Sequence, residues 1–120
     1  IVPRYKGVYM VNARKDTCRY IYIPSYFQEM LNRNNGAFLP ALKEYYRTLV
    51  RPEYHDRFET LCDYDYVREC LSASSTVDFT YQKVDGLWIE LKITVYEKDS
   101  LSGNSDEMLW IFLDESGHIS

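Results

Sequence analysis

The residues that could do chemistry in this chain are its cysteines and histidines, and there are few of them. The cysteines are Cys18, Cys62 and Cys70, and the histidines are His55 and His118. A zinc site needs closely paired ligands such as Cys-x-x-Cys, and no such spacing is present. The odd cysteine count also disfavours a disulfide framework and favours a reducing compartment. The sequence therefore predicts no metal site and a cytoplasmic protein.

Carboxylates late in the chain form a second group with chemical potential. Glu97, Asp99, Asp106 and Glu107 surround a segment rich in serine and glycine. Paired carboxylates can act as acid and base when burial separates their pKa values, but such catalysis also needs a positioned partner. The sequence shows none. We therefore expect a solvated polar loop over residues 97–107 and no catalytic residue in this domain.

Tyrosine is the third conspicuous residue type, with 12 copies in 120 residues. Its ring is a large apolar body with a polar tip. Such a content favours an aromatic-lined pocket or adhesive surfaces, unless the rings are ordinary half-buried positions. A pocket with polar tips inside apolar walls would orient a small ligand; the alternative is a plain filled core. The candidate wall consists of Phe79, Tyr81, Ile89, Leu91 and Ile93 on strands, and of Met30, Tyr45, Tyr46 and Phe58 on helices.

The composition limits the class of protein. The chain has 46% hydrophobic residues and a formal net charge of −4, which is typical of a globular protein and argues against a nucleic-acid partner. No apolar run approaches the roughly 18 residues that cross a membrane. We therefore expect one domain over residues 1–120 without membrane contact. The chain starts without methionine and ends without a helical stop signal, so we expect it to be a piece of a longer protein.

Alternation of apolar and polar residues predicts strands at both ends of the chain. Two of these strands are joined at Asp85-Gly86, a typical hairpin turn. The last strand is apolar throughout, which is expected of a strand covered on both faces. The expected strands are residues 5–12, 17–23, 76–84, 87–96 and 108–113.

Helical signals fill the interval between the hairpins. Ser25 fits a capping box with the glutamine three residues later. A stripe of apolar residues at helical spacing follows, and Pro52 then opens another helix. Asp63 or Asp65 could cap a last one. The sequence therefore predicts an α+β fold: a five-stranded antiparallel sheet with short helices between strands 2 and 3.

This order of elements resembles that of a PAS domain, and local motifs agree with it. Arg51 stands where the usual V-H-P-D-D-R-x-x-F helix start has histidine, and Tyr54 replaces its second acid. The resemblance covers nearly the whole chain. The helix-start motif is V-R-P-E-Y-H-D-R-F at 50–58, and V-D-G-L-W-I at 84–89 is similar to an x-D-G-x-x-W turn. The segment L-D-E-S at 113–116 is similar to a D-I-T-E tail. The segment Y-K-G-V-Y at 5–9 is similar to the opening hairpin of PAS domains that precede GGDEF (diguanylate cyclase) domains.

The resemblance implies a curved sheet whose concave face packs on the short helices. The space between them holds a small molecule or is filled by side chains. The segment after the last strand then transmits the signal to an output domain in the same protein. The resemblance also implies that the outer face of the sheet takes a second protomer, which makes a homodimer the expected assembly.

Two cofactors known from the resembling family are not expected here. Cys18 lies in D-T-C-R-Y-I, which is similar to the flavin-adduct motif N-C-R-F-L, but it lies on the second strand instead of a mid-domain helix. Glu90, Lys92 and Thr94 stand where flavin-binding amides would be expected. His55 lies in the region of a haem ligand, yet it follows a helix-opening proline, where side chains are usually solvated. We predict neither flavin nor haem.

The face of the penultimate strand opposite the core is a candidate contact surface. If its odd-numbered residues face the core, Trp88 and Tyr96 are exposed, and exposed aromatic residues on a sheet mark a partner surface. The alternative is partial cover by the chain's own N-terminus.

The sequence thus predicts a PAS-type sensory domain that binds a small ligand or a partner protomer and regulates an output domain. Two alternatives remain. One is a dimerisation module with a filled core and no ligand. The other, which the opening hairpin disfavours, is a small NTF2-like enzyme.

Overall fold

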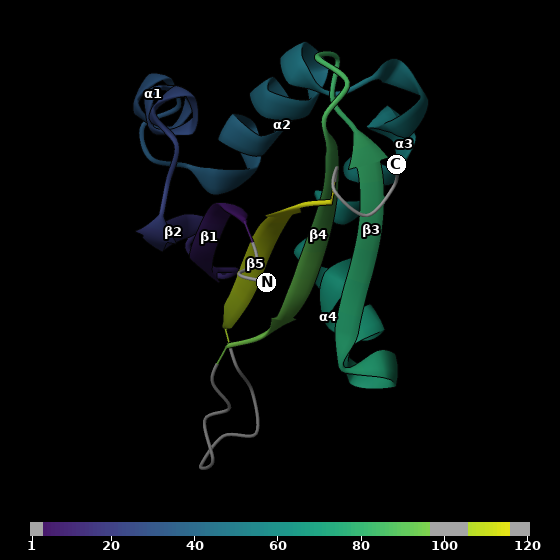
Figure 1. Ribbon diagram of the computed structural model, residues 1–120. Coiled ribbons are helices and arrows are strands. Elements are labelled where there is room, and N and C mark those ends of the chain that lie inside the picture. The colour runs from purple at the N-terminus through teal and green to yellow at the C-terminus, as the bar shows by residue number, and fades with distance from the viewer. Residues whose placement is uncertain (1–3, 97–105, 116–120) are drawn as a thin grey trace.

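The chain forms a five-stranded antiparallel sheet with its helices on one face (Figure 1). The structure, a computed structural model, describes residues 4–96 and 106–115. The strands pair in the order β2-β1-β5-β4-β3, so the first strand lies beside the last. The strands are β1 (Tyr5–Asn12), β2 (Thr17–Tyr22), β3 (Thr76–Gln82), β4 (Trp88–Val95) and β5 (Glu107–Asp114).

All helices of the described residues lie between β2 and β3 in the sequence. They are α1 (Ser25–Arg33), α2 (Phe38–Leu49), the 3₁₀ helix η1 (Pro52–Tyr54), α3 (His55–Leu61) and α4 (Tyr64–Ser74). The α+β class, the five-stranded antiparallel sheet and the helices between strands 2 and 3 are therefore confirmed. The strands also lie close to their expected positions.

The predicted capping box of the first helix is wrong. Pro24 occupies the N-cap position of α1, and no side chain caps this end. Gln28 instead donates a hydrogen bond to Asn32 within the helix, at 3.0 Å. At the last helix the prediction is confirmed for Asp63, whose carboxylate accepts two backbone N–H groups of the first turn of α4.

Asp16 ties the first hairpin to the helical layer. It lies in the β1–β2 turn with a positive φ of 55°, a conformation that aspartate tolerates better than most residues. Its carboxylate accepts the backbone N–H of Leu39 at 3.0 Å and the hydroxyl of Tyr64. Its carbonyl accepts the N–H of Phe38 at 3.0 Å. One turn residue therefore satisfies free amides at the start of α2.

The core lies between the sheet and the helices, and the alternation of the strands sets its composition. In β4 the odd-numbered residues face it, as predicted, and in β5 the even-numbered residues Met108, Trp110 and Phe112 do. The expectation that β5 is covered on both faces is wrong. Leu109, Ile111 and Leu113 on its other face are only half-buried, because the helices pack on one side of the sheet.

Candidate functional site

A β-bulge in β1 turns a lysine towards the helical side of the sheet. Tyr5 pairs with Leu113 and Gly7 pairs with Phe112, so Lys6 is an extra residue without a partner in the register. A bulge of this kind re-aims a side chain and interrupts the alternation. Lys6 thereby joins the core-facing residues of β1 and is half-buried. Its ammonium makes no ion pair with any described residue.

Tyr9 lies next along the same face of β1. Its ring passes over Gly7, and a Cβ atom at that glycine would lie only 2.6 Å from the Tyr9 hydroxyl oxygen. The glycine therefore makes room for the polar end of the tyrosine, a close approach that only a residue without a side chain allows. Burial raises the pKa of Tyr9 far above its ordinary value, so its O–H group remains protonated and available as a donor.

The helices supply the facing wall. Tyr26 and Phe27 come from α1 and Tyr45 comes from α2, with the rings of Tyr26 and Tyr45 stacked at 6.3 Å between centroids and 16° between planes. The ammonium of Lys83 lies 5.2 Å from the centre of the Tyr26 ring, within the range of a cation–π interaction. Burial also raises the pKa of Tyr26. Burial raises the pKa of Tyr45 as well, so both hydroxyls on this wall stay neutral.

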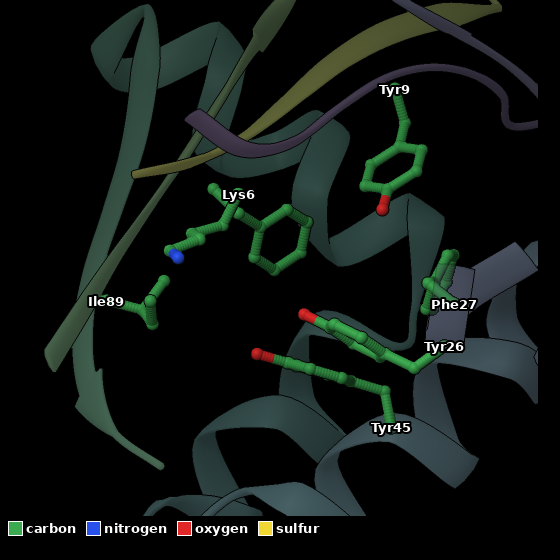
Figure 2. A pocket seen from close by; sticks show the side chains of 7 residues that line it. Lys6, Tyr9, Tyr26, Phe27, Tyr45 and Ile89 are labelled. Carbon is green, nitrogen blue, oxygen red and sulfur yellow. The ribbon is translucent and has the colours of Figure 1, made fainter. Parts of the chain in front are cut away.

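These side chains surround a cavity, which we call the Lys6 pocket. It is partly open to solvent, and its inner volume of about 10 Å³ is room for one water-sized group. Figure 2 shows the Lys6 nitrogen and the oxygens of Tyr26 and Tyr45 turned towards the space beside Ile89, while the Tyr9 oxygen lies apart from them, nearer Phe27. The lining residues are Lys6, Tyr9, Tyr26, Phe27, Tyr45, Ile89 and Phe112.

A buried pair of hydroxyls closes the floor of this region. The oxygens of Tyr45 and Tyr81 lie 2.6 Å apart. Tyr81 is completely buried, so its O–H group needs an acceptor inside the protein. Among the described residues Tyr45 is the acceptor that the structure provides. Tyr81 therefore donates to Tyr45, and the Tyr45 hydroxyl keeps its own proton for the cavity.

Tyr45 and Ile89 are the two residues of the predicted pocket wall that line the Lys6 pocket. The others are packed in the core or at its edge, where they fill the centre of the layer. Phe58 contacts the rings of Tyr45, Tyr46, Phe79 and Tyr81, with centroid distances between 4.9 and 6.2 Å. The core-packed members of the predicted wall are Met30, Tyr46, Phe58, Phe79, Tyr81, Leu91 and Ile93, of which Phe79 is half-buried and the rest are buried.

Sequence reasoning missed Lys6, Tyr9, Tyr26, Phe27 and Phe112 as lining residues. The pattern of alternation cannot show that Lys6 faces the core, because the bulge breaks that alternation. A glycine in the interior of a strand is the signal that could have indicated it, since such glycines mark bulges and close approaches.

The two interface candidates differ in their surroundings. Tyr96 is 42% exposed, which agrees with the expectation for the outer face. Trp88 is half-buried, and its ring lies edge-on to Tyr54 with 6.3 Å between centroids. Full exposure was therefore the wrong expectation for Trp88, because it stands at the end of its strand, where the 3₁₀ helix reaches it.

Cys18, Cys62 and His55 are partly buried within the fold. Burial raises the pKa values of Cys18 and Cys62 to about 11, so both are thiols at neutral pH and weak nucleophiles. His55 is half-buried, with Nε2 2.8 Å from the carbonyl oxygen of Val50. Within residues 4–96 and 106–115, no group of three or more potential ligands is placed to hold a metal ion. The predicted polar loop over residues 97–107 lies mostly outside the described residues.

Comparisons with protein-family models, with curated proteins and with solved structures find no match to this chain. None of the helices in the described part of the chain is long and apolar enough to cross a membrane.

Proposed function

We propose that this chain is a sensory domain of the PAS type that binds a small molecule in the Lys6 pocket and thereby regulates an output domain of the same protein. The observation that carries the proposal is the Lys6 pocket itself. A cation without an ion pair and hydroxyls without internal acceptors turn towards one cavity. In the described part of the chain none of these groups is a fully buried atom without a partner, so water can reach them and a ligand that displaces this water can take over its hydrogen bonds.

The arrangement of elements supports the PAS type. A hairpin, several short helices and three further strands follow one another, and the helices cover one face of the sheet. This is the order that the motifs at residues 50–58 and 84–89 imply. The pocket lies where β1 meets α1 and α2, so an occupant contacts both layers at once. A ligand that binds one arrangement of these layers more tightly than another shifts the population between them.

Thermal unfolding in the presence of a small-molecule panel tests the proposal. A ligand present at ten times its Kd is expected to raise the Tm by about 4–7 °C for a domain of this size. The Gly7→Ala variant should lose this rise, because its new methyl group pushes the Tyr9 hydroxyl into the cavity. A panel of anionic, neutral and cationic compounds that leaves the Tm unchanged would contradict the proposal.

The amino-acid sequence that the gene encodes after Ser120 tests the proposed output domain separately. We expect a heptad-like linker that leads to a catalytic domain of the diguanylate cyclase class. A following domain of any class without a signalling activity would contradict this part of the proposal.

Dimerisation without a ligand is the second candidate function, and the outer face of β5 favours it. Leu109, Ile111 and Leu113 form a half-exposed aliphatic row there, which the described helices do not cover. Sedimentation of the wild type and of Ile111→Glu distinguishes the two functions. A wild-type dimer that the substitution converts to a monomer, combined with an unresponsive pocket, would favour dimerisation.

A further inference from the structure

The Lys6 pocket contains more hydrogen-bond donors than acceptors, and this balance indicates the class of its ligand. The Lys6 ammonium is a donor only. The hydroxyls of Tyr9 and Tyr26 have no hydrogen-bond partner among the described residues. Tyr45 accepts from Tyr81 and so has its own proton left to donate. The polar groups at this cavity are thus one ammonium and three O–H groups.

The charges around the pocket also favour an anion. Lys83 lies over the ring of Tyr26, and its ammonium is 3.9 Å from the carboxylate of Asp85. Asp85 is the nearby acid, since its field helps to raise the pKa values of Tyr26 and Tyr45. Lys83 offsets that acid, which leaves Lys6 as the unbalanced charge. A cationic ligand would meet a like charge at close range, which is unfavourable.

The apolar part of the lining limits the rest of the ligand. Phe27, Ile89 and Phe112 carry no polar side-chain atom, and the inner volume of about 10 Å³ admits one small polar group, so the rest of a ligand lies on the open side of the pocket. A carboxylate can accept from an ammonium and from hydroxyls at once, and such charge-assisted hydrogen bonds are the strong ones. A short apolar substituent would then rest on the aromatic rings.

We propose that the Lys6 pocket takes a small monocarboxylate, held by the Lys6 ammonium and by the hydroxyls of Tyr9, Tyr26 and Tyr45. This inference rests on the proposed function, because it names the ligand class of the same pocket. Lys6 is the residue that selects the charge of the ligand, and the tyrosines orient the carboxylate. The bulge in β1 is the structural device that brings the cation to this position.

Titration of the ¹⁵N-labelled chain tests the inference, with amide shifts followed by NMR at constant ionic strength. The probes are acetate and benzoate, their neutral isosteres acetamide and benzamide, and the cation tetramethylammonium. We expect at least one carboxylate to bind ten-fold or more tightly than its amide, with saturating shifts at Lys6, Tyr9 and Tyr26.

Two variants separate the pocket from general charge effects. Lys6→Met keeps the apolar stem and removes the ammonium, and we expect it to weaken carboxylate binding ten-fold or more. Lys15→Met, at an exposed residue of the β1–β2 turn, changes the net charge equally and should leave the affinity unaltered. Equal losses in both variants would overturn the inference.

The outcomes distinguish the ligand class from the function. Saturable binding of tetramethylammonium, or equal affinities for a carboxylate and its amide, would overturn the carboxylate while the ligand-binding function stands. The absence of saturable binding by any of the five probes would overturn the carboxylate, and the function is then judged separately by the thermal panel with its wider set of compounds.

Discussion

The aromatic core has two halves that differ in how their polar tips are satisfied. In the half under β3 and β4, the Tyr46 hydroxyl donates to Glu59 and the Tyr81 hydroxyl to Tyr45. In the half under β1 and β5, the hydroxyls of Tyr9 and Tyr26 face a cavity without such partners in the described part of the chain. We call these regions the filled half and the pocket half.

Burial alone does not separate the two halves. Tyr9 is 3% exposed and Tyr81 is 0% exposed, so both count as core. The difference lies in the partner of the hydroxyl, which is internal in one half and missing in the other. A substitution in the filled half should therefore act on stability, and one in the pocket half should act mainly on binding.

The largest effect is expected from Phe58→Ala in the filled half. Phe58 is 0% exposed and contacts several other rings, so its removal should lower the free energy of unfolding by about 3–5 kcal/mol. Urea denaturation measures this, with Phe58→Leu as the control of intermediate cost. A loss below about 1 kcal/mol would mean that this half is not tightly packed.

The hydroxyl pair on the border between the halves should respond asymmetrically. Tyr45→Phe strands the completely buried O–H of Tyr81 and should cost about 1–3 kcal/mol of unfolding free energy. Tyr81→Phe leaves a Tyr45 hydroxyl that still faces the cavity, so we expect a cost smaller by about 1 kcal/mol. Chemical denaturation of both single variants and of the double variant measures the coupling. A larger cost for Tyr81→Phe than for Tyr45→Phe would contradict the assignment of Tyr81 as the donor.

Gly7→Ala tests the junction between β1 and the pocket half. The added methyl group must displace the end of the Tyr9 side chain, and we expect a net cost of about 1 kcal/mol, since overpacking is partly offset by the lower entropy of the unfolded chain. Denaturation in urea gives the cost, and ligand titration gives the accompanying loss of affinity. Unchanged affinity would show that the Tyr9 hydroxyl does not border the binding site.

Tyr9→Phe should have the smallest effect at neutral pH, within about 0.5 kcal/mol, because no internal hydrogen bond is lost. The pKa of Tyr9 is raised above 10.0 in the folded chain, so its stabilising contribution is present below pH 10 and is lost as the pH rises further. The variant should therefore become more stable than the wild type by up to about 1 kcal/mol near pH 11. The contributions of Cys18 and Cys62 to the free energy of unfolding are lost between pH 9.0 and about 11 in both proteins. They therefore cancel in the comparison. A constant difference from pH 7 to 11 would contradict the buried phenol.

The sequence was sufficient to predict the strands, their antiparallel sheet and the core-facing side of β4. The alternation of Ile89, Leu91 and Ile93 with polar residues predicted their burial, and the Asp85-Gly86 turn predicted the hairpin. The helices were located by apolar spacing, while the cap at Ser25 failed because Pro24 takes the N-cap position. Local patterns carry this information because it depends on neighbouring residues alone.

The site was less predictable, because its geometry depends on the pairing of distant strands. The bulge at Lys6 exists only through the register of β1 with β5, about a hundred residues later in the chain. The predicted wall named the residues that fill the core, since burial and pocket lining give the same apolar pattern. Tyr45 and Ile89 were found because they lie on the border of the two halves.

The most direct test of the difference between the halves is ¹⁹F NMR of the chain labelled with 3-fluorotyrosine and titrated with acetate. We predict that the resonances of Tyr9 and Tyr26 shift with a common saturation curve while the resonance of Tyr46 stays in place. Equal shifts of all three tyrosines, or a shift confined to Tyr46, would contradict the division into a filled half and a pocket half.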